Sequence, residues 1–141
     1  MNKSYSLSFN IKSMDFSSAG EASSTIKRIL LQLGIPPPIV KKASICSYES
    51  EMNIVIHSHG GVIKLNVDNH QIVIEAIDTG PGIPDIDKAM KAGYSTAPIM
   101  IKEMGFGSGM GLPNIRDNAD KLEITSHSAG THLKIVIIIG G

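Results

Sequence analysis

The chain has 141 residues, 42% of them hydrophobic, and its 13 basic and 13 acidic residues cancel to a formal net charge of zero. Neither sign of charge clusters, which argues against a non-specific nucleic-acid binder. No apolar run is long enough to cross a bilayer, and one cysteine, Cys46, cannot form an internal disulfide. We therefore expect a single cytoplasmic domain, residues 1–141, with one core and no membrane or nucleic-acid partner.

The first two predicted elements are a strand and an amphipathic helix. Within residues 6–16, Leu7, Phe9 and Ile11 alternate with polar side chains, the period of a half-buried strand. In the following segment, Ser18 and Glu21 have the spacing of a capping box, and a glycine suited to end a helix stands at position 34. The apolar stripe of this predicted helix consists of Ala22, Ile26, Ile29, Leu30 and Leu33.

A second helix and a hairpin are predicted next. The helix is expected over residues 39–59, between a run of three prolines and the pair Gly60 and Gly61. Two alternating apolar runs at 62–67 and 71–77 then predict two strands, joined at the turn residues "DNH".

The last part of the chain predicts a short helix at 84–91, a longer helix at 111–120, and a closing hairpin that turns near Ala129 and Gly130. The resulting order is β-α-α-β-β-α-α-β-β. It predicts an α/β (α+β) sandwich of two layers, with a mixed, mostly antiparallel sheet and helices on one face.

Three polar residues of the second predicted helix share one stripe of its surface, because Glu49, Asn53 and His57 are spaced four apart. An amide oxygen suits Mg2+, which takes one or two protein ligands and keeps water and phosphate oxygens for the rest. A nearby carboxylate could accept a proton from a hydroxyl or a water. Taken alone, the same three residues are also typical of an ordinary solvated helix face.

The segment "DTGPGIP" follows an apolar strand, with Asp78 at its entrance. An ionised aspartate can accept a hydrogen bond from an exocyclic amino group such as that of adenine. Gly80 and Gly82 remove side chains at alternate positions, which lets the backbone approach a flat ligand. A simple Asp-Thr-Gly turn followed by Pro-Gly explains the same residues equally well.

The segment "GFGSGMG" is neither a Walker loop, which needs Gly-Lys-Ser or Gly-Lys-Thr, nor the dinucleotide fingerprint. It places Gly107, Gly109 and Gly111 at alternate positions that open directly into a predicted helix. Exposed amides there, with the positive end of the helix, would bind a polyphosphate. A flexible glycine-rich linker is the alternative interpretation.

Together, the three segments closely resemble the N, G1 and G2 boxes of the GHKL (HATPase_c, or Bergerat) ATP-binding fold, shared by gyrase, Hsp90, histidine kinases and MutL. The resemblance covers about residues 5–138. The wording "DTGPGIPDIDKAMKAGYST" and "GMGLPNI" is most similar to the anti-sigma-factor serine/threonine kinases, especially the stressosome switch kinase. One departure is the segment "APIMIKEMGF", which is longer than in the switch kinases.

The resemblance implies a role for each matching residue. Asn53 would be the Mg2+ ligand, Glu49 the catalytic carboxylate and Asp78 the partner of the adenine amino group. A lid is expected at residues 94–106. The nucleotide-binding residues implied by the resemblance are Asn53, His57, Asp78, Gly80, Gly82, Ile83, Tyr94, Ser95, Thr96, Gly105, Gly107, Ser108, Gly109, Met110, Gly111, Leu112 and Thr131.

By resemblance, the chain is expected to use ATP and Mg2+ as a protein serine/threonine kinase and anti-sigma-type regulator. Its partner would be a STAS-domain anti-sigma antagonist or a sigma factor, and a homodimer is left open. The alternative is a nucleotide-gated module that sequesters a sigma factor or another regulator without significant catalysis. Glu49 favours the enzyme, because binding ATP does not need that carboxylate. A third interpretation, the catalytic domain of a histidine kinase, would require a separate dimerisation protein.

Overall fold

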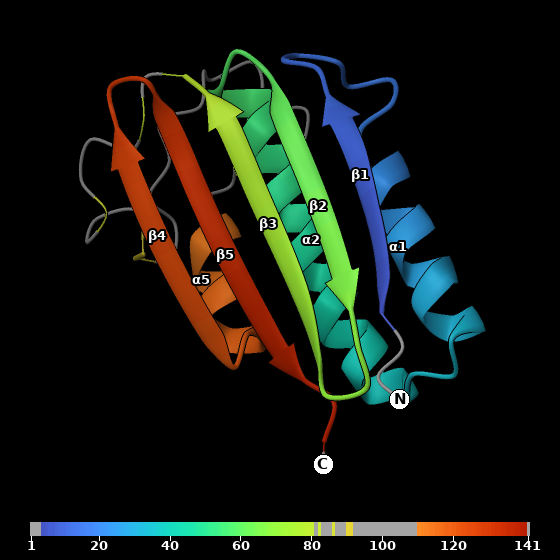
Figure 1. The fold of residues 1–141 in the computed structure, drawn as a ribbon. Coiled ribbons are helices and arrows are strands. Elements are labelled where there is room, and N and C mark those ends of the chain that lie inside the picture. The colour runs from blue at the N-terminus through green and yellow to red at the C-terminus, as the bar shows by residue number, and fades with distance from the viewer. Residues whose placement is uncertain (1–3, 81, 83–85, 87–89, 92–109, 141) are drawn as a thin grey trace.

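A five-stranded sheet covered on one face by helices forms the described part of the chain (Figure 1). The computed structural model describes residues 4–80, 82, 86, 90–91 and 110–140. In chain order the elements are β1 (Tyr5–Ile11), α1 (Glu21–Gln32), α2 (Pro37–His57), β2 (Gly61–Val67), β3 (Gln71–Thr79), α5 (Gly111–Asn118), β4 (Lys121–His127) and β5 (Gly130–Ile138). The expected two-layer sandwich is confirmed.

The sheet differs in one respect from the expected one. Its strand order is β1-β2-β3-β5-β4, and all four pairings between these strands are antiparallel, whereas a mixed, mostly antiparallel sheet was expected. Two helices connect β1 to β2, and each of them reverses the direction of the chain (Figure 1). The chain therefore returns beside β1 in the opposite direction, whereas a parallel neighbour is usually reached through one crossover helix.

The hydrophobic core lies between the sheet and the helices. Alternate residues of β2 and β3 point into it, as the period of two in the sequence predicted. On α1, Ile26 and Leu30 are fully buried, whereas Leu33 follows the helix and is 47% exposed. The largest buried apolar side chains are Ile26, Leu30, Ile54, Ile63, Leu65, Ile72, Ile74, Ile115, Ile135 and Ile137.

The two ends of α1 differ in how well they were predicted. At its end, Gly34 has φ +80°, and the Ile35 N–H donates to the Leu30 carbonyl at 3.1 Å, which confirms the glycine stop. At its start the expected capping box is wrong. The N-cap residue is Gly20, which has no side chain that could accept a hydrogen bond from the helix. Instead, the buried carboxylate of Glu51, on α2, accepts hydrogen bonds from backbone N–H groups at the start of the helix.

Most of the segment between β3 and α5 lies outside the described residues. The expected lid at 94–106 lies outside them, as does most of the short helix expected at 84–91. Within that helix, the Met90 N–H donates to the Ile86 carbonyl at 3.0 Å, a bond of helical spacing. No helix among the described residues is long and apolar enough to cross a membrane.

Candidate functional site

Helices α2 and α5 bring together two of the three segments predicted to form the site. These are the polar stripe with Glu49 and Asn53 and the glycine-rich segment that ends at Gly111. A Cβ atom built on Gly111, the first residue of α5, would lie 3.2 Å from Glu49 Oε2 and 3.5 Å from Asn53 Oδ1. Any side chain at position 111 would thus enter the space in front of both polar groups. The geometry leaves a side-chain-free backbone beside a carboxylate and an amide oxygen, which suits a phosphate bound together with a hard cation.

The surroundings of Glu49 change the pKa of its carboxyl. Its side chain is half-buried on α2, and burial raises the pKa of the carboxyl above its usual range. A side-chain hydrogen bond from Asn114, on α5, lowers the pKa and so acts against burial. A carboxylate with a raised pKa accepts a proton more readily than an exposed one, which is what a general base requires.

His57 completes the stripe predicted on α2. It lies in the last turn of the helix, four residues after Asn53, and is half-buried. Burial lowers the pKa of its imidazole, so the ring is neutral at pH 7. A neutral ring can accept or donate a hydrogen bond but brings no positive charge to a phosphate.

Asp78 lies within β3, which extends through Thr79, and not directly after the strand as the sequence suggested. It stands between Gly61 of β2 and Thr131 of β5, so both neighbouring strands hold its backbone. Its Oδ1 atom accepts a hydrogen bond from the Thr131 N–H at 3.1 Å, and burial raises the pKa of the carboxyl. Among the described residues, no hydrogen-bond donor reaches its Oδ2 atom.

The hairpin of β4 and β5 forms a second wall near Asp78. The hydroxyls of Ser126 and Thr131 lie 3.0 Å apart, and these residues face each other across the two strands. Gly82 has φ +77°, and a Cβ there would meet the His127 carbonyl and lie 2.9 Å from Ser126 Oγ. Glycine at position 82 therefore lets the chain pass directly against this hairpin.

The remaining predicted site residues are distributed differently. Gly80 is buried against Ser58, whose Cα atom would lie 3.0 Å from a Cβ on Gly80. Met110 caps α5 and is 38% exposed, whereas Leu112 is 6% exposed and packs in the core. The predicted residues Ile83, Tyr94, Ser95, Thr96, Gly105, Gly107, Ser108 and Gly109 lie outside the described part of the chain.

Two residues at the candidate site were missed by the sequence analysis. Asn114 follows Gly111 by one helical turn, so the predicted helix at 111–120 contained a signal that could have found it. Ser126 is opposite Thr131 only because of the register of the last hairpin. Its position in the sequence carries no comparable signal.

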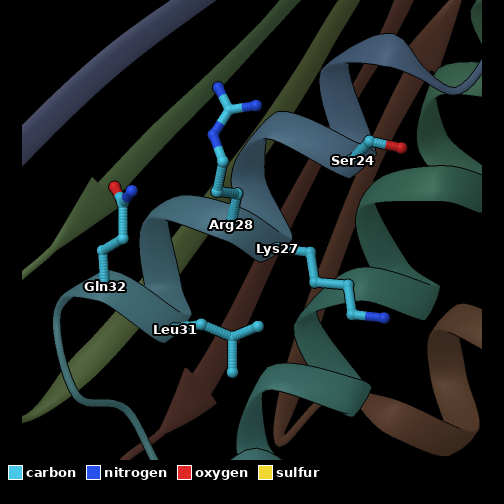
Figure 2. Close-up of a pocket in the computed structure, with 5 residues that line it drawn as sticks. All are labelled: Ser24, Lys27, Arg28, Leu31 and Gln32. Carbon is cyan, nitrogen blue, oxygen red and sulfur yellow. The ribbon is translucent and has the colours of Figure 1, made fainter.

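Two other hollows lie away from this site. Five residues of α1 line a surface depression: Ser24, Lys27, Arg28, Leu31 and Gln32. Lys27 and Leu31 point to one side of the helix, and Arg28 and Gln32 to another (Figure 2). The second hollow lies among β1, α1 and α2, with Glu51 in its lining. Neither is lined by any of the predicted site residues.

Comparison with known proteins identifies the family. Residues 48–139 match the family described as "Histidine kinase-, DNA gyrase B-, and HSP90-like ATPase". The chain belongs to this ATPase family. The matched region contains Glu49, Asn53, Asp78, Gly111 and Thr131, and the membership confirms the resemblance drawn from the three boxes.

Relatives within the ATPase family are named as regulators and as a kinase. The anti-sigma F factor of Thermoanaerobacter sp. (strain X514) is 29% identical, over 93% of this chain and 95% of the relative. The serine/threonine-protein kinase RsbT of Bacillus subtilis (strain 168) is 30% identical, over 69% of this chain and 72% of the relative. The anti-sigma F factor of Clostridium acetobutylicum is also 30% identical, over 63% of this chain and 62% of the relative.

Membership in this ATPase family implies ATP as the ligand, and the geometry around Gly111 agrees with it. Among the described residues, no three His, Cys, Asp or Glu side chains cluster as a metal site. Mg2+ does not need such a cluster, since it is usually held by one or two protein groups plus the phosphates. Asn53 has a suitable oxygen donor, so the donor set of the described residues fits a metal carried in with the nucleotide.

Proposed function

We propose that the chain is an ATP-dependent protein serine/threonine kinase and anti-sigma-type regulator. Its substrate would be a serine or threonine hydroxyl on a small regulatory protein of the STAS type. The observation that carries this proposal is the position of the Glu49 carboxylate beside Gly111 and close to the Asn53 amide oxygen. A protein that only bound ATP would not need a carboxylate with a raised pKa at this place.

In this proposal, two elements hold the nucleotide at its two ends. Asp78 accepts a hydrogen bond from the adenine amino group through its Oδ2 atom, while Oδ1 keeps the bond from the Thr131 N–H. At the other end, the N-terminal amides of α5, which begins at Gly111, and the positive end of its dipole would face the phosphates. The loop glycines Gly107 and Gly109 would continue this cradle.

Asn53 and Glu49 would then act on the γ-phosphate and the incoming hydroxyl. Asn53 Oδ1 would ligate Mg2+, and the bound metal would neutralise charge on the phosphate oxygens. Glu49 accepts the proton of the serine or threonine hydroxyl while the hydroxyl oxygen forms a bond to the γ-phosphorus. The bond from the γ-phosphorus to the bridging oxygen breaks, and ADP leaves with the electron pair.

Radiolabel transfer from ATP to candidate STAS-domain proteins tests the kinase. We expect Asn53→Ala to weaken Mg-ATP binding and abolish transfer together, because both need the metal ligand. Glu49→Gln should keep nucleotide binding and lower transfer by on the order of a hundredfold, because glutamine preserves shape and cannot accept the proton. Glu123→Gln, an exposed change on β4, is the matched control. Equal transfer by wild type and Glu49→Gln would show that Glu49 does not take part in the reaction.

A second function is favoured by the names of the relatives. Two of the three described above are anti-sigma F factors, so the chain could act mainly by sequestering a sigma factor or another regulator under the control of ATP. Binding of a partner that depends on nucleotide, with no transfer by any variant, would favour this alternative over the kinase.

A further inference from the structure

Ser126 lies in a polar row that crosses three strands at one end of the sheet. Asp78 pairs with Thr131 across β3 and β5, and Thr131 pairs with Ser126 across β5 and β4. Two residues away along β3 and β5, Ala76 and Leu133 form the next pair and belong to the hydrophobic core. Because alternate residues of a strand share one face, the polar row lies on the face of the sheet that the helices cover.

Hydrogen bonds join the three residues of this row. The Thr131 N–H donates to Asp78 Oδ1 at 3.1 Å, and the hydroxyl oxygens of Thr131 and Ser126 lie 3.0 Å apart. Thr131 is buried, so its hydroxyl needs a hydrogen-bond partner within the protein, and Ser126 supplies one. Ser126 also borders Gly82, since a Cβ built on that glycine would lie 2.9 Å from Ser126 Oγ. Ser126 therefore lies against two of the residues predicted to bind the nucleotide.

The direction of the bond between the two hydroxyls decides what Thr131 can offer a ligand. A hydroxyl has one hydrogen to donate. If Thr131 donates to Ser126, that hydrogen is used, whereas if Ser126 donates, the Thr131 hydrogen stays available to an acceptor. Adenine has an acceptor nitrogen in its ring beside the exocyclic amino group. Guanine has a carbonyl oxygen and a ring N–H at the same two places.

We propose that Ser126 is a positioning residue of the nucleotide site, which donates its hydroxyl hydrogen to Thr131 Oγ1 and so selects adenine over guanine. The inference rests on the placement of adenine beside Asp78 in the proposed function, and it does not depend on phosphoryl transfer. With Ser126 as donor, the site offers a carboxylate acceptor at Asp78 and a hydroxyl donor at Thr131, which together complement adenine. Guanine would instead set its carbonyl oxygen against the carboxylate and its ring N–H against the hydroxyl hydrogen.

Affinities for Mg-ATP and Mg-GTP, measured by titration calorimetry on the full chain, distinguish selection from a purely structural role. Losing one neutral hydrogen bond predicts that Ser126→Ala weakens ATP binding about fivefold, while affinity for GTP stays within about twofold. Ser126→Thr keeps the hydroxyl and should keep the preference for ATP. Thr125→Ala, an exposed change at the neighbouring residue of β4, should leave both affinities unchanged. In a Thr131→Val background, Ser126→Ala should have no further effect, because the hydroxyl that it orients is gone.

A nucleotide analogue tests the same contact with the wild-type protein. In 1-deaza-ATP, a C–H group replaces the ring nitrogen beside the amino group. The wild type should bind this analogue about fivefold more weakly than ATP, because the Thr131 hydroxyl loses its acceptor. Ser126→Ala should bind the two nucleotides with nearly equal affinity.

Equal binding of ATP and 1-deaza-ATP by the wild type would overturn the proposal. So would a lower melting temperature of Ser126→Ala with an unchanged preference for ATP over GTP, since Ser126 would then only support the hairpin. Selective binding of ATP that depends on Ser126, in a protein that transfers no phosphate to any partner, would support this proposal and overturn the kinase instead.

Discussion

The carboxylate of Glu51 accepts a hydrogen bond from the backbone N–H of Ser23 at 3.1 Å, although 28 residues separate them in the chain. Glu51 is 2% exposed and also accepts bonds from the N–H groups of Gly20 and Ala22. A carboxylate at the positive end of a helix is stabilising, and here it satisfies donors that would otherwise lack partners. The helix that carries Glu49 and Asn53 thus also fixes the start of α1.

Glu51→Ala should destabilise the fold. The change would leave three N–H groups at the buried start of α1 without an acceptor. We expect this to lower the unfolding free energy by about 3 kcal/mol. Urea unfolding measures the change. Glu21→Ala, which removes an exposed acid from the first turn of the same helix, should cost less than about 0.5 kcal/mol. Equal, small losses in both variants would show that Glu51 contributes no more than an ordinary acid near a helix end.

Gly111→Ala should weaken the site without weakening the fold. The added methyl group would lie 3.2 Å from Glu49 Oε2 and 3.5 Å from Asn53 Oδ1, in the space assigned to phosphate and metal. We expect affinity for Mg-ATP to fall about tenfold, a loss of roughly 1.4 kcal/mol, while the melting temperature stays the same or rises, since alanine favours a helix over glycine. Calorimetry and thermal unfolding measure the two effects. Unchanged affinity would mean that phosphate does not approach Gly111.

Asp78→Asn should remove most of the binding of ATP and of ADP. The asparagine amide cannot accept the adenine hydrogen bond with the strength of a carboxylate, and binding of both nucleotides depends on the same base. Titration calorimetry with each nucleotide measures the loss. Asp68→Asn, in the turn at the far end of β3, is the matched control and should bind both normally. Absence of adenine-nucleotide binding in the wild type would contradict the proposed function.

Glu49→Gln should stabilise the nucleotide-free protein, and the gain should depend on pH. Burial raises the pKa of Glu49 in the folded state, so its contribution to stability is full below the ordinary pKa of glutamate and is lost as pH rises through the raised value. Glutamine has no charge to bury. Unfolding in urea at roughly pH 4 and pH 8 should therefore show a larger advantage of Glu49→Gln at the higher pH. A gain that is equal at both values would contradict the burial of an ionised carboxylate.

Features that depend on neighbouring residues in the chain were predictable from the sequence. The alternation of Leu7, Phe9 and Ile11 predicted the first strand, and Gly34 predicted the end of α1. Spacing of four placed Glu49 and Asn53 on one stripe of α2. These predictions succeed because the period of an element and the φ angle of a glycine are local properties. The order of the three boxes was specific enough to indicate the ATPase family.

The sequence by itself indicated the family and most of the described elements and proposed the candidate residues, whereas only the tertiary structure decided which of the described ones meet. The cap of α1 comes from Glu51 and not from the local capping box, because a buried carboxylate on α2 reaches the same N–H groups. The proximity of Gly111 to Glu49 depends on how α5 packs against α2, and Ser126 reaches Thr131 only through the register of a hairpin. Such contacts join residues whose separation along the chain carries no periodic signal, so their partners are chosen by packing.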